Sequence, residues 1–135
     1  MFDWDDYIKV SKSLVKYARV NSTIAEGFYR SGVSRAYYAA YHAALDYALT
    51  IGYNERRYRN SLRGNVRKLG QHRLLTHYLL NQSDPNTQSL GASLETCRFK
   101  RTECDYDQKV IVDKRYTVIC FVETDNIHGL ISSLP

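Results

Sequence analysis

The segment SRAYYAAYHAA, residues 34–44, constrains the fold of this chain more than any other stretch. Alanine is the best helix former, and its small side chain lets a second helix approach closely. A helix that carries several tyrosines beside alanines is typical of the centre of a helical bundle. At about 100° per residue, Arg35 and His42 lie on nearly one line of this helix, with Tyr38 between them as a supporting residue. The sequence therefore predicts one helix face that carries all three side chains.

Composition favours one domain over residues 1–135. Of the 135 residues 44% are hydrophobic, and only two are proline and seven glycine. A chain of this length buries a core without disulfides or metals. Cys97, Cys104 and Cys120 lack metal-ligand spacing and indicate a reducing compartment. Because no apolar run reaches the roughly 20 residues that span a bilayer and the acidic start is unlike a signal peptide, we expect a cytoplasmic protein without membrane contact.

Hydrophobic periodicity predicts an all-α fold with five helices. A short apolar run at residues 110–112 could form a strand, but no partner strand is evident. The first expected helix covers residues 4–20, and the second opens with a Thr23 and Glu26 capping box and ends near Gly52. A mostly irregular connection with a turn or two of helix follows over residues 53–70. The remaining helices are expected over residues 74–79, over residues 90–105 and from Asp113 onward.

Positive charge is concentrated in one segment. Between residues 56 and 83 there is no Asp or Glu, although the chain has 14 acidic residues in all. Removing the seven basic residues of this segment from the 19 in the chain leaves 12, fewer than the acids, so the net charge of +5 comes from this segment. Clustered arginines beside tyrosines favour phosphate contacts and stacking on exposed RNA bases, whereas a solvated loop or a surface for an acidic protein is the alternative. The seven are Arg56, Arg57, Arg59, Arg63, Arg67, Lys68 and Arg73.

Arg35 and His42 are the candidate catalytic pair. A histidine can move a proton to or from a ribose hydroxyl or a leaving oxygen, while an arginine stabilises the charge that builds on phosphorus. This chemistry requires no metal and no cofactor. The alternative is that both side chains are internal polar residues bonded between helices. Arg67 and His72 have a similar spacing and form a second candidate pair.

Asp105 is a candidate supporting residue. It follows Arg101 by four positions, close enough to pair along one helix, and it could instead reach across the bundle to Arg35. His72 and His77 could suggest a metal, but no carboxylate or cysteine is near them in the sequence. We therefore expect no metal site.

Residues 34–44, together with the later segment RTECDYD at residues 101–107, resemble the HEPN family of small helical-bundle proteins. The resemblance implies an antiparallel four- or five-helix up-and-down bundle, usually a homodimer, often encoded beside a small nucleotidyltransferase as a toxin and antitoxin pair. Many HEPN proteins are metal-independent ribonucleases in which arginine and histidine motifs of two subunits meet in one cleft. We therefore expect an RNA-directed protein, an endoribonuclease toxin of a toxin-antitoxin or phage-defence system, with Arg35 and His42 as catalytic residues. The alternative is a non-catalytic helical module that binds a nucleotidyltransferase.

Overall fold

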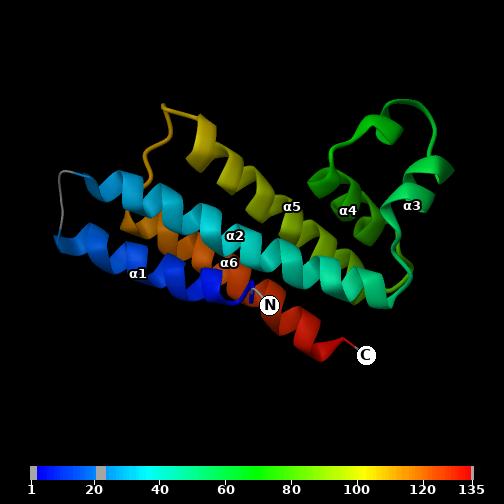
Figure 1. The fold of residues 1–135 in the computed structure, drawn as a ribbon, viewed down its shortest axis with the longest axis horizontal. Helices are drawn as coiled ribbons and strands as arrows, with labels where there is room; N and C mark the ends of the chain where they lie inside the picture. The colour runs from blue at the N-terminus through cyan, green and yellow to red at the C-terminus, as the bar shows by residue number, and fades with distance from the viewer. Residues whose placement is uncertain (1–2, 21–23, 135) are drawn as a thin grey trace.

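Six α-helices and one short 3-10 helix make up most of residues 3–20 and 24–134, the part of the chain that this computed structural model describes (Figure 1). They are α1 (Asp6–Val20), α2 (Ala25–Thr50), α3 (Glu55–Ser61), η2 (Gly64–Lys68), α4 (Gln71–Leu80), α5 (Pro85–Tyr106) and α6 (Lys114–Ser133). The all-α prediction is confirmed, and no strand occurs in the described ranges. None of these helices is both long and apolar enough to cross a membrane.

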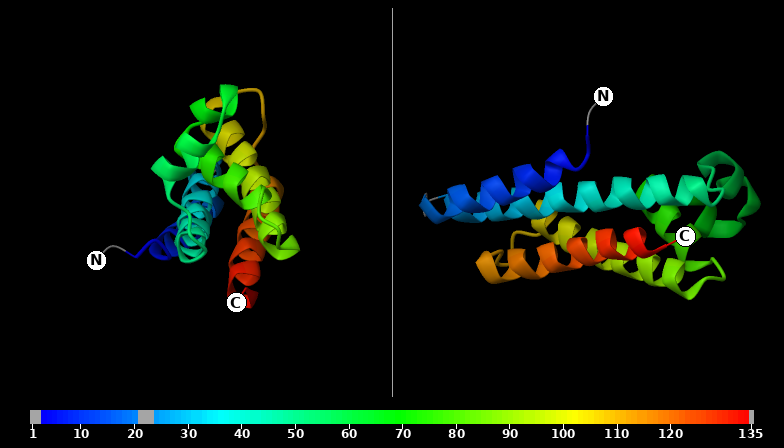
Figure 2. Two further views of the ribbon diagram at one scale, coloured as in Figure 1. Left: turned by 90° about the vertical axis from the view of Figure 1, so that its right-hand side faces the viewer. Right: turned by 90° about the horizontal axis from the view of Figure 1, so that it is seen from below.

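Four long helices form the body of the molecule, and α3 and α4 are inserted between α2 and α5 at one end (Figure 1). Along the long axis, α1 and α5 run opposite to α2 and α6, so that consecutive long helices are antiparallel (Figure 1 and Figure 2). α2 is the central helix, because it packs against α1, α4, α5 and α6. The bundle therefore has an up-and-down arrangement with a small helical unit after its second long helix.

Aspartates begin the last two helices. The Asp84 side chain accepts a hydrogen bond from the backbone N–H of Thr87 at the start of α5, and the Asp113 side chain accepts one from Tyr116 N–H at the start of α6. The predicted cap at Asp113 is confirmed. α5 begins earlier than the apolar periodicity indicates, because an N-cap aspartate followed by Pro85 in the first turn is itself a strong start signal.

The ends of α2 match the expectations in part. The helix ends before Gly52, whose φ of +97° is a left-handed conformation that favours glycine, as predicted. Thr23 of the expected capping box lies outside the described residues. Glu26 accepts hydrogen bonds from the Arg30 guanidinium and from the backbone N–H of Val112, so its carboxylate connects α2 to the segment before α6.

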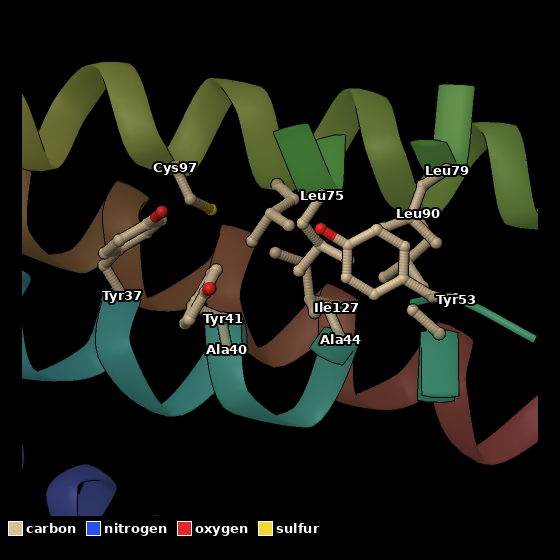
Figure 3. Packing of buried hydrophobic residues seen from close by; sticks show 12 residues of the cluster. Tyr37, Ala40, Tyr41, Ala44, Tyr53, Leu75, Leu79, Leu90, Cys97 and Ile127 are labelled. Carbon is tan, nitrogen blue, oxygen red and sulfur yellow. The ribbon is translucent and has the colours of Figure 1, made fainter. Parts of the chain in front are cut away.

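The core forms where α2 faces α4, α5 and α6. Tyr37 points from α2 toward α5, close to Cys97, Tyr41 follows one turn later on α2, and Ile127 enters from α6 (Figure 3). Most alanines of α2 are almost fully buried and allow this close approach, which confirms that residues 34–44 form the central helix. They are Ala36, Ala39, Ala40, Ala44 and Ala48. The largest cluster of buried residues comprises Tyr37, Ala40, Tyr41, Ala44, Ala48, Tyr53, Leu75, Leu79, Leu90, Leu94, Cys97 and Ile127.

The cysteines behave as small apolar core residues. Cys97, Cys104 and Cys120 are buried and free. Burial raises the pKa of the Cys97 and Cys120 thiols to about 12 and that of Cys104 to about 11. All three therefore remain protonated thiols at neutral pH.

Candidate functional site

The predicted face of α2 carries a cluster of aromatic and basic side chains. Tyr38 and His42 are half-buried on this face, and Arg35 is exposed. α1 and the turn before it supply two further rings, α4 supplies His72, and α5 supplies Arg101. We call this group the α2-face cluster; it consists of Trp4, Tyr7, Arg35, Tyr37, Tyr38, Tyr41, His42, His72, Arg101 and Asp105.

Three tyrosines of α2 hold His72. The Tyr37 hydroxyl lies 2.7 Å from His72 Nδ1, the Tyr41 ring stacks on the imidazole with centroids 4.0 Å apart, and Tyr38 contacts it edge-on at 5.9 Å. A hydrogen bond and a stack together fix both the position and the tilt of the ring. The tyrosines that the sequence assigns to core packing therefore also form a socket for a histidine from the first turn of α4.

His42 is fixed by stacking. Its ring lies flat against the Trp4 indole, with centroids 3.3 Å apart and planes 12° apart, and it meets the edge of Tyr41 at 5.1 Å. Neither ring nitrogen of His42 has a hydrogen bond to another described residue. The ring is therefore held by its faces.

Arg35 contacts the same cluster through a ring on α1, that of Tyr7. Its Cζ lies 5.0 Å from the centroid of the Tyr7 ring, a cation–π contact. Tyr7 in turn meets Trp4 edge-on at 5.4 Å, and Trp4 covers His42. Arg35 and His42 therefore share one face, as the helical spacing predicts, but two aromatic rings of the N-terminal region lie between them.

Arg101 is the arginine beside the socket of His72. Its Nε lies 2.8 Å from Asp105 Oδ2 as an ion pair that lacks the alignment of a hydrogen bond, and its Nη2 donates to the Tyr38 hydroxyl at 2.8 Å. Asp105 therefore follows the first of the two predicted options and pairs along α5 with Arg101. No contact joins it to Arg35 in the described structure. The Ser34 hydroxyl approaches Asp105 Oδ2 at 3.5 Å.

Both histidines of the cluster are biased toward the neutral form. Burial lowers the pKa of His72, and the positive charges of Arg101, His42 and Arg98 lower it further. Burial also lowers the pKa of His42, although the carboxylate of Asp46 opposes this effect. Two neutral imidazoles therefore lie beside a guanidinium at pH 7.

These lowered pKa values predict that acid destabilises the fold. A histidine whose pKa is below 6.5 in the folded chain binds its proton more readily in the unfolded chain, so stability falls as the pH drops below about 6.5. We expect the melting temperature to fall between pH 7.5 and 5.5. His72→Gln, whose amide can still accept from Tyr37, is expected to reduce that fall, and His77→Gln on the same helix is expected to retain it. A wild-type melting temperature that is constant over this range would contradict the prediction.

The seven basic residues of the positive segment lie on α3, η2, the link between them and the first turn of α4, which together we call the basic arm. Six of the seven side chains are exposed. Arg59 is half-buried: it donates to the backbone carbonyls of Arg67 and Leu69 and pairs with Glu55. Arg59 therefore shapes the arm, and the other six give its surface a positive charge.

Tyrosines attach the basic arm to the bundle. The Tyr58 hydroxyl on α3 lies 2.6 Å from His77 Nδ1 on α4, and the Tyr78 hydroxyl donates to the carbonyl of Ile51 at the end of α2. Tyr53 is buried between them. The arm is therefore held in place at its α3 end.

The structure does not bring Arg67 to His72. The Arg67 guanidinium donates to Asn60 Oδ1 at 3.3 Å within the arm, while His72 is enclosed by tyrosines of α2. Arg101 takes the place next to His72 that the spacing assigned to Arg67. Within the described residues, no group of three or more His, Cys, Asp or Glu side chains could hold a metal ion.

Comparisons with known proteins identify no relative: no protein-family model, no curated protein and no solved structure matches this chain. The α2-face cluster and the basic arm are therefore the features of this chain that bear on its function.

Proposed function

We propose that this protein is an RNA-directed helical bundle of the HEPN type and a metal-independent endoribonuclease. The basic arm contacts the RNA backbone, and the α2-face cluster acts on one phosphodiester. A toxin of this kind would work as a cytoplasmic homodimer and be restrained by a nucleotidyltransferase-type antitoxin. The observation that carries the proposal is that the exposed arm leads within four residues, from Lys68 to His72, into a cluster with two neutral histidines and two arginines.

The basic arm suits a polyanion. The arm contains one carboxylate, Glu55, and it is already paired with Arg59. The tyrosines near it attach the arm to the bundle instead of presenting free faces to bases: Tyr53 is buried, and Tyr58 and Tyr78 are half-buried and hydrogen-bonded. Phosphate contacts with a flexible single strand need charge rather than a groove of fixed width, and the exposed arginines supply it.

The cluster suits cleavage by the neighbouring ribose hydroxyl. In this reaction His42 takes the proton of the 2′-hydroxyl, the 2′ oxygen bonds to phosphorus, and the bond from phosphorus to the 5′ oxygen breaks. The leaving 5′ oxygen takes a proton from solvent, and the product is a cyclic phosphate. Arg35 and Arg101 supply positive charge where negative charge builds on the phosphate oxygens.

Removing charge from the basic arm is expected to lower the affinity for RNA and to make that affinity less sensitive to salt concentration. For the variant Arg57→Gln, Arg63→Gln and Lys68→Gln, the slope of log affinity against log salt should fall by about 0.7 for each RNA phosphate that the arm no longer neutralises. Fluorescence anisotropy with a labelled single-stranded RNA over a series of salt concentrations measures this slope.

The matched control is Lys12→Gln, Lys16→Gln and Arg19→Gln, which removes the same charge from exposed positions of α1. We expect it to retain the wild-type slope. Equal slopes in the two triple variants would show that RNA recognises only net charge, and the basic arm would then lose its assigned role.

A second candidate function is the non-catalytic module that binds a nucleotidyltransferase. Two observations favour it: Asp105 already neutralises Arg101, and Trp4 covers one face of His42. In this function the cluster only joins α1, α2, α4 and α5, and the arm docks on an acidic protein surface. Binding of an acidic partner without any RNA affinity would select this function over the first.

A further inference from the structure

The hydrogen bond between Tyr37 and His72 has no part in the reaction described above, yet it is the most enclosed polar contact of the α2-face cluster. Tyr37 is 1% exposed, and its hydroxyl lies 2.7 Å from His72 Nδ1. His72 is also stacked on Tyr41 and touched by Tyr38, so the imidazole cannot turn over without breaking its interactions with all three tyrosines.

The direction of this bond determines the tautomer of His72. The hydroxyl of Tyr37 has no other hydrogen-bond partner among the described residues, and burial raises its pKa, so it keeps its proton. If the hydroxyl donates to Nδ1, its hydrogen is satisfied and the ring proton lies on Nε2. If His72 donates instead, the hydroxyl hydrogen is left without an acceptor in the core, which is unfavourable.

The second ring nitrogen of His72 is unused. Nε2 has no hydrogen bond to a described residue, and it is not one of the sealed atoms without a partner, which in the described chain are Arg101 Nε and His128 Nε2. The positive charges that act on the ring come from Arg101 and Arg98, which pair with Asp105 and Glu95. An N–H donor in such surroundings suits a phosphate oxygen.

We propose that Tyr37 is a positioning residue that holds His72 in the tautomer with its proton on Nε2, so that His72 donates a hydrogen bond to a phosphate and does not act as a base. The assignment of the phosphate rests on the proposed function, whereas the tautomer does not. The two histidines then have different roles in the reaction. His42, whose nitrogens have no hydrogen bond to a described residue, accepts the proton, and His72 binds the phosphate.

Nitrogen NMR of the full chain measures the tautomer directly. In long-range proton–nitrogen spectra at pH 7.5, His72 is expected to show an unprotonated Nδ1 and a protonated Nε2, with its signals identified by their loss in His72→Gln. Tyr37→Phe should give signals averaged over both tautomers. A proton on Nδ1 in the wild type, which needs no variant to fold, would overturn the proposal, as would an unchanged tautomer in a folded Tyr37→Phe.

The chain contains its own control, because Tyr58 contacts Nδ1 of His77 in the same way at 2.6 Å. Tyr58→Phe removes an equivalent hydroxyl that also bonds a histidine of α4, without touching the α2-face cluster. We expect it to alter the signals of His77 and to leave those of His72 unchanged. Coupled changes at both histidines would mean that a general loosening of α4, and not Tyr37, sets the tautomer.

A single-stranded 2′-O-methyl RNA, which lacks the attacking hydroxyl, tests the phosphate role. Saturation with this RNA is expected to shift His72 Nε2 and its proton, and to leave His77 in place. If the RNA binds by anisotropy and Nε2 does not move, the phosphate role of His72 fails while the RNA-directed function stands. If no RNA binds, the proposed function and the phosphate role both fail, and the tautomer measurement still decides the role of Tyr37.

Discussion

Replacing His42 by glutamine is expected to lower the rate of RNA cleavage by 10²- to about 10⁴-fold, the usual contribution of a general base. Glutamine keeps a planar group that can lie against Trp4, but it cannot take a proton near neutral pH. Because burial lowers the pKa of His42, the neutral ring should dominate down to below pH 6.5, and wild-type activity should fall only at more acidic pH. Initial rates on a fluorogenic RNA in the presence of EDTA measure both effects.

The control for this prediction is His77→Gln. His77 lies on α4 and bonds Tyr58 at the base of the basic arm, outside the α2-face cluster. We expect this variant to cleave RNA at close to the wild-type rate. Equal rates for wild type and His42→Gln would remove His42 from proton transfer, and a loss of the same size in His77→Gln would trace the effect to the fold.

Local signals made most of the fold predictable. The cap at Asp113, the stop at Gly52 and the alanine-rich centre of α2 depend on neighbouring residues, so the sequence shows them directly. The apolar pattern predicts too late a start for α5, because the residues around Pro85 indicate a turn and a helix start equally well. The Val110 to Val112 stretch has strand-like composition, yet it forms an irregular connection to α6 that bonds Glu26 and Arg30 of α2.

Only the part of the candidate site that depends on residues near one another in the sequence was predictable. Arg35, Tyr38 and His42 share a face because helical spacing alone places them there. The contact of His72 with Tyr37 spans 35 residues, and the contact of Arg101 with Tyr38 spans 63. No spacing rule covers such separations, so they depend on how α4 and α5 pack on α2. The usable signal was the excess of tyrosine on α2, since a hydroxyl buried in a core requires a partner.

Arg30 belongs to no motif, although it makes more long-range hydrogen bonds than the predicted site residues do. Its guanidinium donates to the backbone carbonyls of Glu103 at 3.2 Å, Cys104 at 2.9 Å and Asp107 at 3.0 Å, and also to Val110. The last carbonyls of a helix have no partner within the helix, so one side chain of α2 satisfies the end of α5 and the connection to α6. Backbone acceptors leave no trace in a sequence, and for this reason the contact could not be foreseen.

Arg30→Met is therefore expected to lower the free energy of unfolding by about 2 to 4 kcal/mol. Hydrogen bonds from a charged donor contribute about 1.5 to 3 kcal/mol each, but the side chain is 21% exposed and water can replace part of them. Methionine keeps the apolar stem, so the loss reports the guanidinium. Denaturant unfolding measures the change, and a fall in melting temperature of roughly 10 °C should accompany it.

Two further variants show whether a loss of stability in Arg30→Met comes from the hydrogen bonds of its guanidinium. Arg115→Met removes an exposed arginine from the first turn of α6 and should stay within about 0.5 kcal/mol of wild type. Arg30→Lys keeps the charge but loses the planar fork, so it should recover only part of the stability. If Arg30→Met proved as stable as Arg115→Met, water would satisfy those carbonyls as well as the guanidinium does, and the end of α5 would not depend on α2.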